Sequence, residues 1–436
     1  MVDLTPAPVS DHSEADHSSW STDFTTLWLL GMLVLLPVKF MTFPYHMNLV
    51  DFWIVPALLI FWLSFVLGRQ SIIVNPYFAA IWLIVVGSLV STFAARNVSG
   101  SLVVLLKEVY LFTLFVTLIV MLSRLSARNM RLVMLAWLTM VMIHGILILG
   151  QFSSPDLWRF CSRFGGTTVD VDHYRPSGLY FRPSGLFISE KAGDANKAAF
   201  YQLLGFVPLV LTSRSKRIAT ILGIVLFSSI LATGSMGATI AFTTGLIVAV
   251  VAIIAVGKNL VLVKKILLPL IIASSFLGAL LMFVFNHNDQ SHLEDILVGR
   301  AEKSSGGRFA LWQRGFDVLL DHDVTFITGI GPENFREVDG KGNQLHNDLL
   351  AFVVERGLLG GMGLVALGGI AVCRATYMLR IYGTYLQGGG LKLIVFFATM
   401  IAILVESLTH QVFHARELWL FLALQEAFLF RLASSR

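Results

Sequence analysis

Charged residues are scarce in this sequence. Asp, Glu, Lys and Arg together make up 14% of its 436 residues, whereas 56% of the residues are hydrophobic. Soluble domains carry roughly 25% charged residues, so the composition excludes an ordinary soluble protein and indicates one that is integral to a membrane. The formal net charge of +5 is what basic cytoplasmic loops alone supply, and it gives no indication of nucleic-acid binding.

Cysteine, nucleotide motifs and a basic leader are also missing or rare. The two cysteines, Cys161 and Cys373, are too few for a zinc site, and the topology below places them on opposite sides of the membrane. No P-loop sequence is present, which excludes that class of ATP and GTP sites. The N-terminus is acidic and lacks the basic start of a secretory signal peptide, so we expect residues 1–23 to form a disordered cytoplasmic tail.

Long apolar runs dominate residues 24–434, which we expect to form a single transmembrane domain. Because roughly 17 to 25 apolar residues span a bilayer as a helix, the runs predict an all-α integral membrane protein with about twelve transmembrane helices. Lys and Arg gather in alternate short connections, which places those connections and both termini in the cytoplasm. The runs are 24–41, 50–68, 77–95, 102–122, 130–150, 197–213, 217–233, 236–256, 266–285, 348–373, 391–409 and 413–431.

Two connections, 151–196 and 286–347, are long, and both fall on the outer side in this topology. The first contains a short duplication, in which Arg175 and Arg182 each begin an Arg-Pro-Ser-Gly-Leu-aromatic sequence. Proline keeps each arginine out of the helical conformation, and each Ser-Gly turn exposes backbone N–H groups. The two turns either cradle phosphate oxygens or serve only as structural turns, and the sequence favours neither.

The second long connection carries three polar motifs. Gly307-Arg308-x-x-x-Trp312 opens a short helix predicted over 309–319, and Gly329-x-Gly331-Pro332 predicts a turn. His346-Asn347 lies where the loop meets the tenth apolar run. A histidine in that place accepts a proton near neutral pH, although a lone histidine at a helix start is more often a cap or a solvated side chain.

A metal site is the weaker hypothesis for this loop. His287, Asp289 and His292 lie close together at its beginning. Their pattern is more typical of a solvated segment than of a metal site, so we expect no metal.

In combination, the motifs resemble those of the O-antigen ligase and polymerase superfamily of bacterial membrane enzymes. The segment from Arg182 to Asn196 is similar to a family segment with arginine, glycine and phenylalanine that ends in asparagine, and the resemblance covers about 180–434. Further matching residues are Gly307, Arg308, Trp312, Gly329, Gly331, Pro332, His346, Asn347, Glu355, Gly357 and Gly360.

The sequence departs from the family pattern at Met236, which stands where the family usually has an arginine. If that arginine holds a substrate phosphate in relatives, another cation must replace it here. Candidates are Arg175, Arg300 and Arg314.

The resemblance implies glycosyl transfer on the periplasmic face of the bacterial inner membrane. The donor would be a glycan on undecaprenyl pyrophosphate. The acceptor would be a hydroxyl of lipid A–core for a ligase, or of a second lipid-linked glycan for a polymerase. His346 would act as general base, and Arg182, Arg308 and Arg175 would bind the pyrophosphate, because arginine meets phosphate charge without a metal or cofactor. Direct displacement would invert the anomeric carbon.

Four further residues are expected to support this site. Asn347 or Glu355 would orient His346, and Trp312 and Gly357 belong to the same family motifs. Glu355 lies about two and a half helical turns, roughly 13 Å, beyond His346. We therefore expect no direct contact between Glu355 and the histidine. Instead, we expect Glu355 to pair with Arg356 or with a neighbouring helix.

Two alternative functions stay open at this stage. A polymerase of the same superfamily, making O-antigen, capsule or exopolysaccharide, uses the same donor chemistry. A lipid-linked glycan transporter would account for charges within or near the spans, at Lys107, Glu108, Glu355, Arg356 and Glu406. The long outer loops and the lack of a clear internal repeat count against a transporter, which would also tolerate changes at Arg308 and His346.

Overall fold

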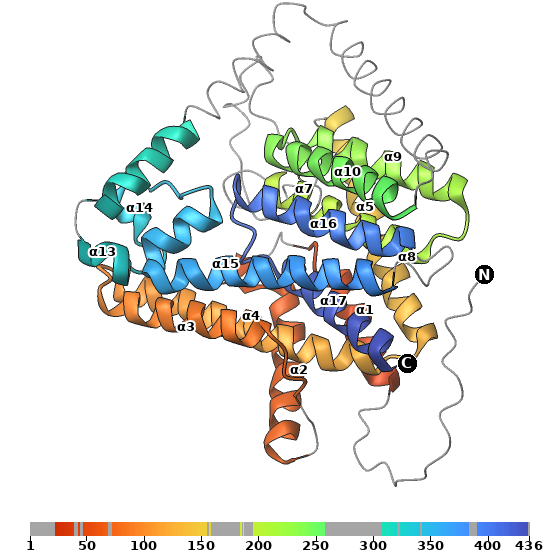
Figure 1. Cartoon of the computed structure of the whole chain (residues 1–436), viewed down its shortest axis with the longest axis horizontal. Coiled ribbons are helices and arrows are strands. Elements are labelled where there is room, and N and C mark those ends of the chain that lie inside the picture. The colour runs from red at the N-terminus through yellow and green to blue at the C-terminus, as the bar shows by residue number, and fades with distance from the viewer. Residues whose placement is uncertain are drawn as a thin grey trace, which may run out of the picture.

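The described chain is almost entirely helical (Figure 1). Its structure is a computed structural model, and it describes residues 22–38, 42–43, 47–68, 72–154, 157, 184, 186, 195–257, 307–320, 323–340, 342–382 and 390–434. Two strands of two residues each, β1 (Thr42–Phe43) and β2 (Met47–Asn48), pair antiparallel, and these residues contain no other strand. The predicted all-helical class is therefore confirmed apart from this short pair.

The helices follow the apolar runs of the sequence. They are α1 (Thr22–Leu35), α2 (Leu49–Val66), α3 (Tyr77–Phe93), α4 (Val98–Arg124), α5 (Ala127–Ser153), α7 (Ala195–Leu204), α8 (Phe206–Thr212), α9 (Lys216–Ala232), α10 (Met236–Gly257), α13 (Asp323–Thr328), α14 (Phe335–Val338), α15 (Asp348–Tyr382), α16 (Gly390–Ser407) and α17 (Arg416–Ser434). A further helix covers 307–320, which confirms the short helix predicted in the second long loop.

Ten of the twelve predicted spans each coincide with one helix, and 266–285 lies outside the described residues. The run 197–213 was expected to be one helix, but it is divided into α7 and α8. Pro208 has no N–H for the carbonyl of Leu204, and its ring crowds that carbonyl, so α7 ends at Leu204. Helix α1 begins at Thr22, and residues 1–21 of the predicted tail lie outside the described residues.

Five helices of the described chain are long and apolar enough to cross a membrane: Leu49–Val66, Val98–Arg124, Ala127–Ser153, Met236–Ile254 and Asp348–Arg380. Phe24–Leu35 and Tyr77–Phe93 are apolar but shorter. These helices fit a multi-pass membrane protein, and the count of about twelve spans, like the two long outer loops, stays a prediction.

Helix α15 lies at the centre of the arrangement, between α3 and α4 on one side and α16 on the other (Figure 1). Small residues let α3 and α15 approach closely. A Cβ added at Gly87 would lie 2.6 Å from the backbone nitrogen of Gly360, and one at Gly363 would lie 2.8 Å from the backbone nitrogen of Ile84. The two backbones are therefore in contact along this seam.

Helix α15 is broken at Gly357, whose φ of 66° and ψ of −167° are not helical. The break leaves the carbonyls of Val354 and Glu355 without their usual partners along the helix. The turn that begins at Gly329 replaces those partners, because Ile330 N–H donates to Val354 at 3.1 Å and Gly331 N–H donates to Glu355 at 2.9 Å. Broken helices with satisfied backbone groups are typical of binding sites inside membrane proteins.

Candidate functional site

His346 lies at the start of α15, next to the segment that joins α16 to α17. Its ring stacks on the ring of His410, with centroids 6.1 Å apart and planes inclined by 19°. The carboxylate of Asp348 accepts hydrogen bonds from the backbone N–H groups of Val412 (2.9 Å) and Phe413 (3.1 Å). This clamp holds residues 408–415 against the beginning of α15, and it brings the two histidines together.

Asn347 has a structural task in this arrangement. Its side-chain oxygen accepts the N–H of Leu350 at 2.9 Å, and its carbonyl accepts the N–H of Ala351 at 2.9 Å. These are the bonds of a helix N-cap. Asn347 therefore fixes where α15 begins and, through the backbone, where His346 lies.

Arg308 enters the same region from the helix at 307–320. Trp312, on that helix, packs against the buried cluster that includes Leu345 and Leu350, so the helix docks on the beginning of α15. Arg308 is partly buried. Burial lowers the pKa of its guanidinium, and the negative charge of Glu406 opposes that shift. The structure therefore brings Arg308 within the electrostatic reach of Glu406.

Glu406 is fully buried and lies near the end of α16, one turn before His410, whose N–H donates to the Glu406 carbonyl at 2.8 Å. A Cβ added at Gly237 would lie 3.0 Å from Glu406 Oε2, so the start of α10 adjoins the same carboxylate. Met236, which occupies the place of a family arginine, is 47% exposed at this helix start. Ser235, just before it, donates to the Asn196 side chain at 2.9 Å.

Of the three arginines that are candidates to replace the family arginine at Met236, the structure describes Arg314. Arg314 forms an ion pair with Asp339 and also donates to its carbonyl at 3.1 Å. Burial opposes ionisation of Asp339, but hydrogen bonds from Arg314 and Asn343 hold its pKa below the usual value. Arg314 is thus already engaged in stabilising the loop, while Arg175 and Arg300 lie outside the described residues.

Arg182 also lies outside the described residues, but Ser184 of the same Arg-Pro-Ser-Gly sequence is described. Its N–H donates to Gln151 at 3.0 Å, and its carbonyl lies 3.1 Å from Nε2 of His144. The side-chain nitrogen of Gln202 lies 2.8 Å from His144 Nδ1. Since Gln202 donates to Nδ1, the proton of neutral His144 sits on Nε2 and points at Ser184, which fixes the turn on α5.

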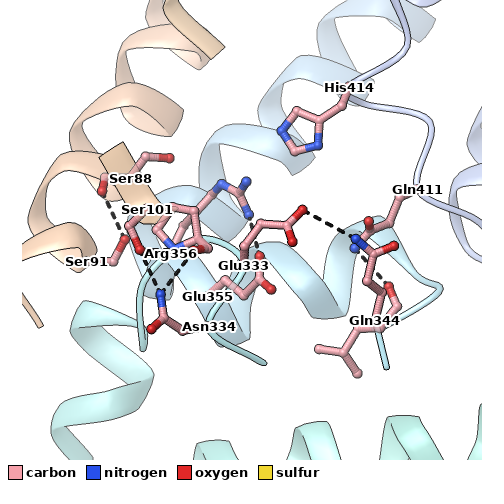
Figure 2. Close-up of polar contacts among 12 residues, drawn as sticks. Ser88, Ser91, Ser101, Glu333, Asn334, Gln344, Glu355, Arg356, Gln411 and His414 are labelled. Carbon is pink, nitrogen blue, oxygen red and sulfur yellow. Dashed lines mark hydrogen bonds and ion pairs between the residues drawn. The ribbon is translucent and has the colours of Figure 1, made fainter. Parts of the chain in front are cut away.

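Glu355 and Gly357 lie at the break of α15 and not beside His346. Arg356 donates to Glu108 at 2.7 Å and to Glu355 at 3.2 Å, which confirms the expected Glu355–Arg356 pairing. Ser88 donates to Glu108 at 2.6 Å, and His414 Nε2 lies 3.4 Å from the same carboxylate. Figure 2 shows Ser88, Glu355, Arg356 and His414 of this network. The side chains of Arg356 and Glu108 are each only 1% exposed, so this is a buried, internally paired network.

The described part of the chain contains no group of three His, Cys, Asp or Glu side chains that could hold a metal ion. The loop residues His287, Asp289 and His292 lie outside that part.

Sequence reasoning missed Glu406 and His410 as members of the site. Glu406 was noted only as a charge near a span, which would fit a transporter. The signal that would have found both residues is their spacing of four, which places them on adjacent turns at the end of an apolar run, where ionisable residues are usually functional.

Comparison with known families agrees with the motifs. Residues 203–365 match the family model described as O-antigen ligase, and this range includes Arg308, His346 and the break of α15. No curated protein matches the chain. This match supports the resemblance of the chain to the O-antigen ligase and polymerase superfamily.

Proposed function

We propose that this protein is an O-antigen ligase-type glycosyltransferase. It moves a glycan from undecaprenyl pyrophosphate to a hydroxyl of lipid A–core. The reaction takes place at the periplasmic face of the bacterial inner membrane, with both termini of the chain in the cytoplasm. The match to the O-antigen ligase family model supports the reaction class, and the site at the start of α15 supplies the chemical groups that the reaction needs.

The observation that carries this proposal is the meeting of three segments at one polar site. The helix at 307–320 brings Arg308, the start of α15 brings His346, and the end of α16 with the following segment brings Glu406 and His410. A fixed cation and a histidine within one half-buried site are the two parts that transfer from a lipid pyrophosphate requires.

In the proposed reaction, His346 takes the proton from the acceptor hydroxyl. The acceptor oxygen then attacks the anomeric carbon while the bond from that carbon to the pyrophosphate oxygen breaks, so the configuration is inverted. The leaving pyrophosphate carries the negative charge, which Arg308 meets, together with Arg182 and Arg175 from the first long loop. The negative charge of Glu406 favours the charged form of Arg308 before the donor arrives.

No metal or cofactor is part of this proposal. Undecaprenyl pyrophosphate is already a good leaving group, and guanidinium groups stabilise its charge through paired hydrogen bonds. A preorganised donor of this kind typically contributes 10²–10³-fold to a rate.

The test is a transfer assay with the purified protein in proteoliposomes, in the presence of EDTA. Undecaprenyl-pyrophosphate glycan is offered with lipid A–core or with a second lipid-linked glycan. The proposal predicts glycan attached to lipid A–core. Growth of the glycan on its lipid carrier instead would make the protein a polymerase, and movement of the intact lipid-linked glycan across the bilayer without transfer would contradict the enzyme proposal altogether.

A further inference from the structure

Glu333 has an unusual backbone conformation. Its φ of 64° makes it the one non-glycine residue with positive φ in the part of the chain that the structure describes. Glycine, asparagine and aspartate adopt this region most readily, whereas a longer side chain disfavours it. A glutamate therefore stands where a turn after Pro332 would be more stable with glycine, and strained residues of this kind gather at functional sites.

The local contacts of Glu333 do not account for its presence. Its carboxylate pairs with Arg336 at 3.1 Å, but the two side chains are 40% and 44% exposed, respectively, and exposed pairs contribute little stability. Its other contact is a long hydrogen bond of 3.3 Å from Gln344. The backbone N–H of Glu333 hydrogen-bonds to the carboxylate of Glu355, which any residue except proline would also do.

The side chain of Glu333 points toward a set of polar groups from separate segments (Figure 2). Gln344 precedes α15, while Gln411 and His414 come from the segment between α16 and α17. Gln344, Gln411, His414 and Glu333 are all partly exposed. Gln411 donates to the carbonyl of Leu345 at 3.0 Å, so its side chain lies beside the backbone that carries Gln344.

The chemistry of this group fits sugar hydroxyls. A hydroxyl donates one hydrogen bond and accepts others, so it is matched by carboxylate acceptors beside carboxamides that do both. The group does not fit a phosphate, because the carboxylates of Glu333 and Glu355 repel anions. Two cations lie near the group: Arg336 is paired with Glu333 itself, and Arg356 is paired with Glu108 and Glu355.

The position of the group relates it to the reacting hydroxyl. Gln344 lies two residues before His346, and Gln411 follows His410, whose ring stacks on that of His346. We propose that Glu333, Gln344 and Gln411 form a subsite for the ring hydroxyls of the acceptor sugar, the sugar whose free hydroxyl His346 activates. This assignment rests on the proposed function, since it takes His346 as the base.

Binding measurements on the purified full chain in nanodiscs test the subsite without turnover. The probes are deacylated core oligosaccharide, undecaprenyl pyrophosphate without glycan, and the lipid-linked glycan donor, each titrated by calorimetry. Glu333→Gln and Glu333→Gly are expected to weaken binding of the oligosaccharide about tenfold, the loss typical of one charged hydrogen bond. Binding of undecaprenyl pyrophosphate and of the donor stays unchanged.

Two controls separate this role from a structural one. Arg336→Gln removes the ion-pair partner of Glu333 and is expected to bind the oligosaccharide like the wild type. Glu333→Gly relieves the backbone strain, so it is expected to unfold at the same or a higher temperature while binding the sugar less well. In the transfer assay, Glu333→Gln raises KM for the acceptor about tenfold and leaves kcat and the KM for the donor unchanged.

The outcomes are distinct. The subsite is overturned if Glu333→Gly binds the oligosaccharide as tightly as the wild type does. It is also overturned if the wild type does not bind the oligosaccharide. Weakened binding of the donor glycan alone overturns its assignment to the acceptor. If oligosaccharide binding depends on Glu333 but no transfer to any acceptor occurs, the subsite stands and the proposed function fails.

Discussion

The start of α15, beside His346, and its break at Gly357 differ in the burial and pairing of their charged side chains. At the break, Arg356, Glu108 and Glu355 are buried and paired with one another. At the start, His346 and Arg308 are partly exposed, and their neighbours come from separate segments. Charges that are closed off inside the protein hold the broken helix in place, whereas charges open to solvent are able to meet a substrate. Changes at the break should therefore affect folding, and changes at the start should affect the reaction.

The largest effect is expected at the break. Arg356→Met leaves Glu108 and Glu355 buried without a cation, which should lower the free energy of unfolding by about 3–5 kcal/mol. The double variant Arg356→Met with Glu108→Leu should recover much of that loss, since it removes the charge that Arg356 contacts most closely. Thermal unfolding of the reconstituted protein measures both. Equal stability of Arg356→Met and wild type would show that the network does not hold the break.

At the start, Arg308→Ala should lower the transfer rate about 10²–10³-fold with little change in stability. Arg314→Ala is the matched control, because Arg314 lies on the same helix but is engaged by Asp339. Its loss should leave the rate nearly unchanged and lower stability by about 1–3 kcal/mol, because the buried carboxylate of Asp339 loses a partner. Equal rate losses in the two variants would contradict the specific role of Arg308.

The pH dependence of stability is expected to originate near the break. Burial lowers the pKa of His414, in the segment between α16 and α17, to about 4, despite its hydrogen bond with Glu108. The unfolded chain, with a pKa near 6.5, then binds more protons than the folded chain between these two values. Stability is complete above pH 6.5 and falls by about 3 kcal/mol as pH falls toward 4. His414→Gln should flatten the unfolding temperature across this window, and an unchanged pH profile would refute the role of His414.

The smallest effect sharpens the boundary between the two regions. Asn347 is adjacent to His346, yet it acts as the cap of α15. Asn347→Ala should cost about 1 kcal/mol of stability, while Asn347→Asp, which keeps the capping oxygen, should cost less. Both should leave kcat within a few-fold of wild type in the transfer assay. A loss of rate as large as that of Arg308→Ala would place Asn347 among the reacting groups instead.

Much of the fold was predictable because its main signal is local. Apolar runs locate the helices, and Pro208 explains the division of α7 from α8 that the run length alone hides. Family motifs gave His346, Arg308 and the glycine at the break. Hydropathy does not show that Gly357 breaks α15, because the run continues through it without a change in composition.

The missing members of the site depend on long-range contacts. Glu406 and His410 are more than 50 residues from His346 in the sequence, and only the packing of α16 and residues 408–415 against α15 brings them there. Glu333 is likewise invisible in the sequence as a special residue, since its distinction is a backbone angle. Arg356 pairs with Glu108 of α4, 248 residues earlier, and composition does not show this pairing. From the sequence alone, these charges therefore counted in favour of a transporter.

The most direct test of the central claim is the initial transfer rate of His346→Ala beside that of the wild type, in the same proteoliposomes and with unfolding temperature measured on both. If His346 is the general base, the rate falls about 10²–10⁴-fold while the unfolding temperature and the binding of undecaprenyl pyrophosphate stay unchanged. A variant that folds normally and transfers glycan at the full wild-type rate would contradict the account.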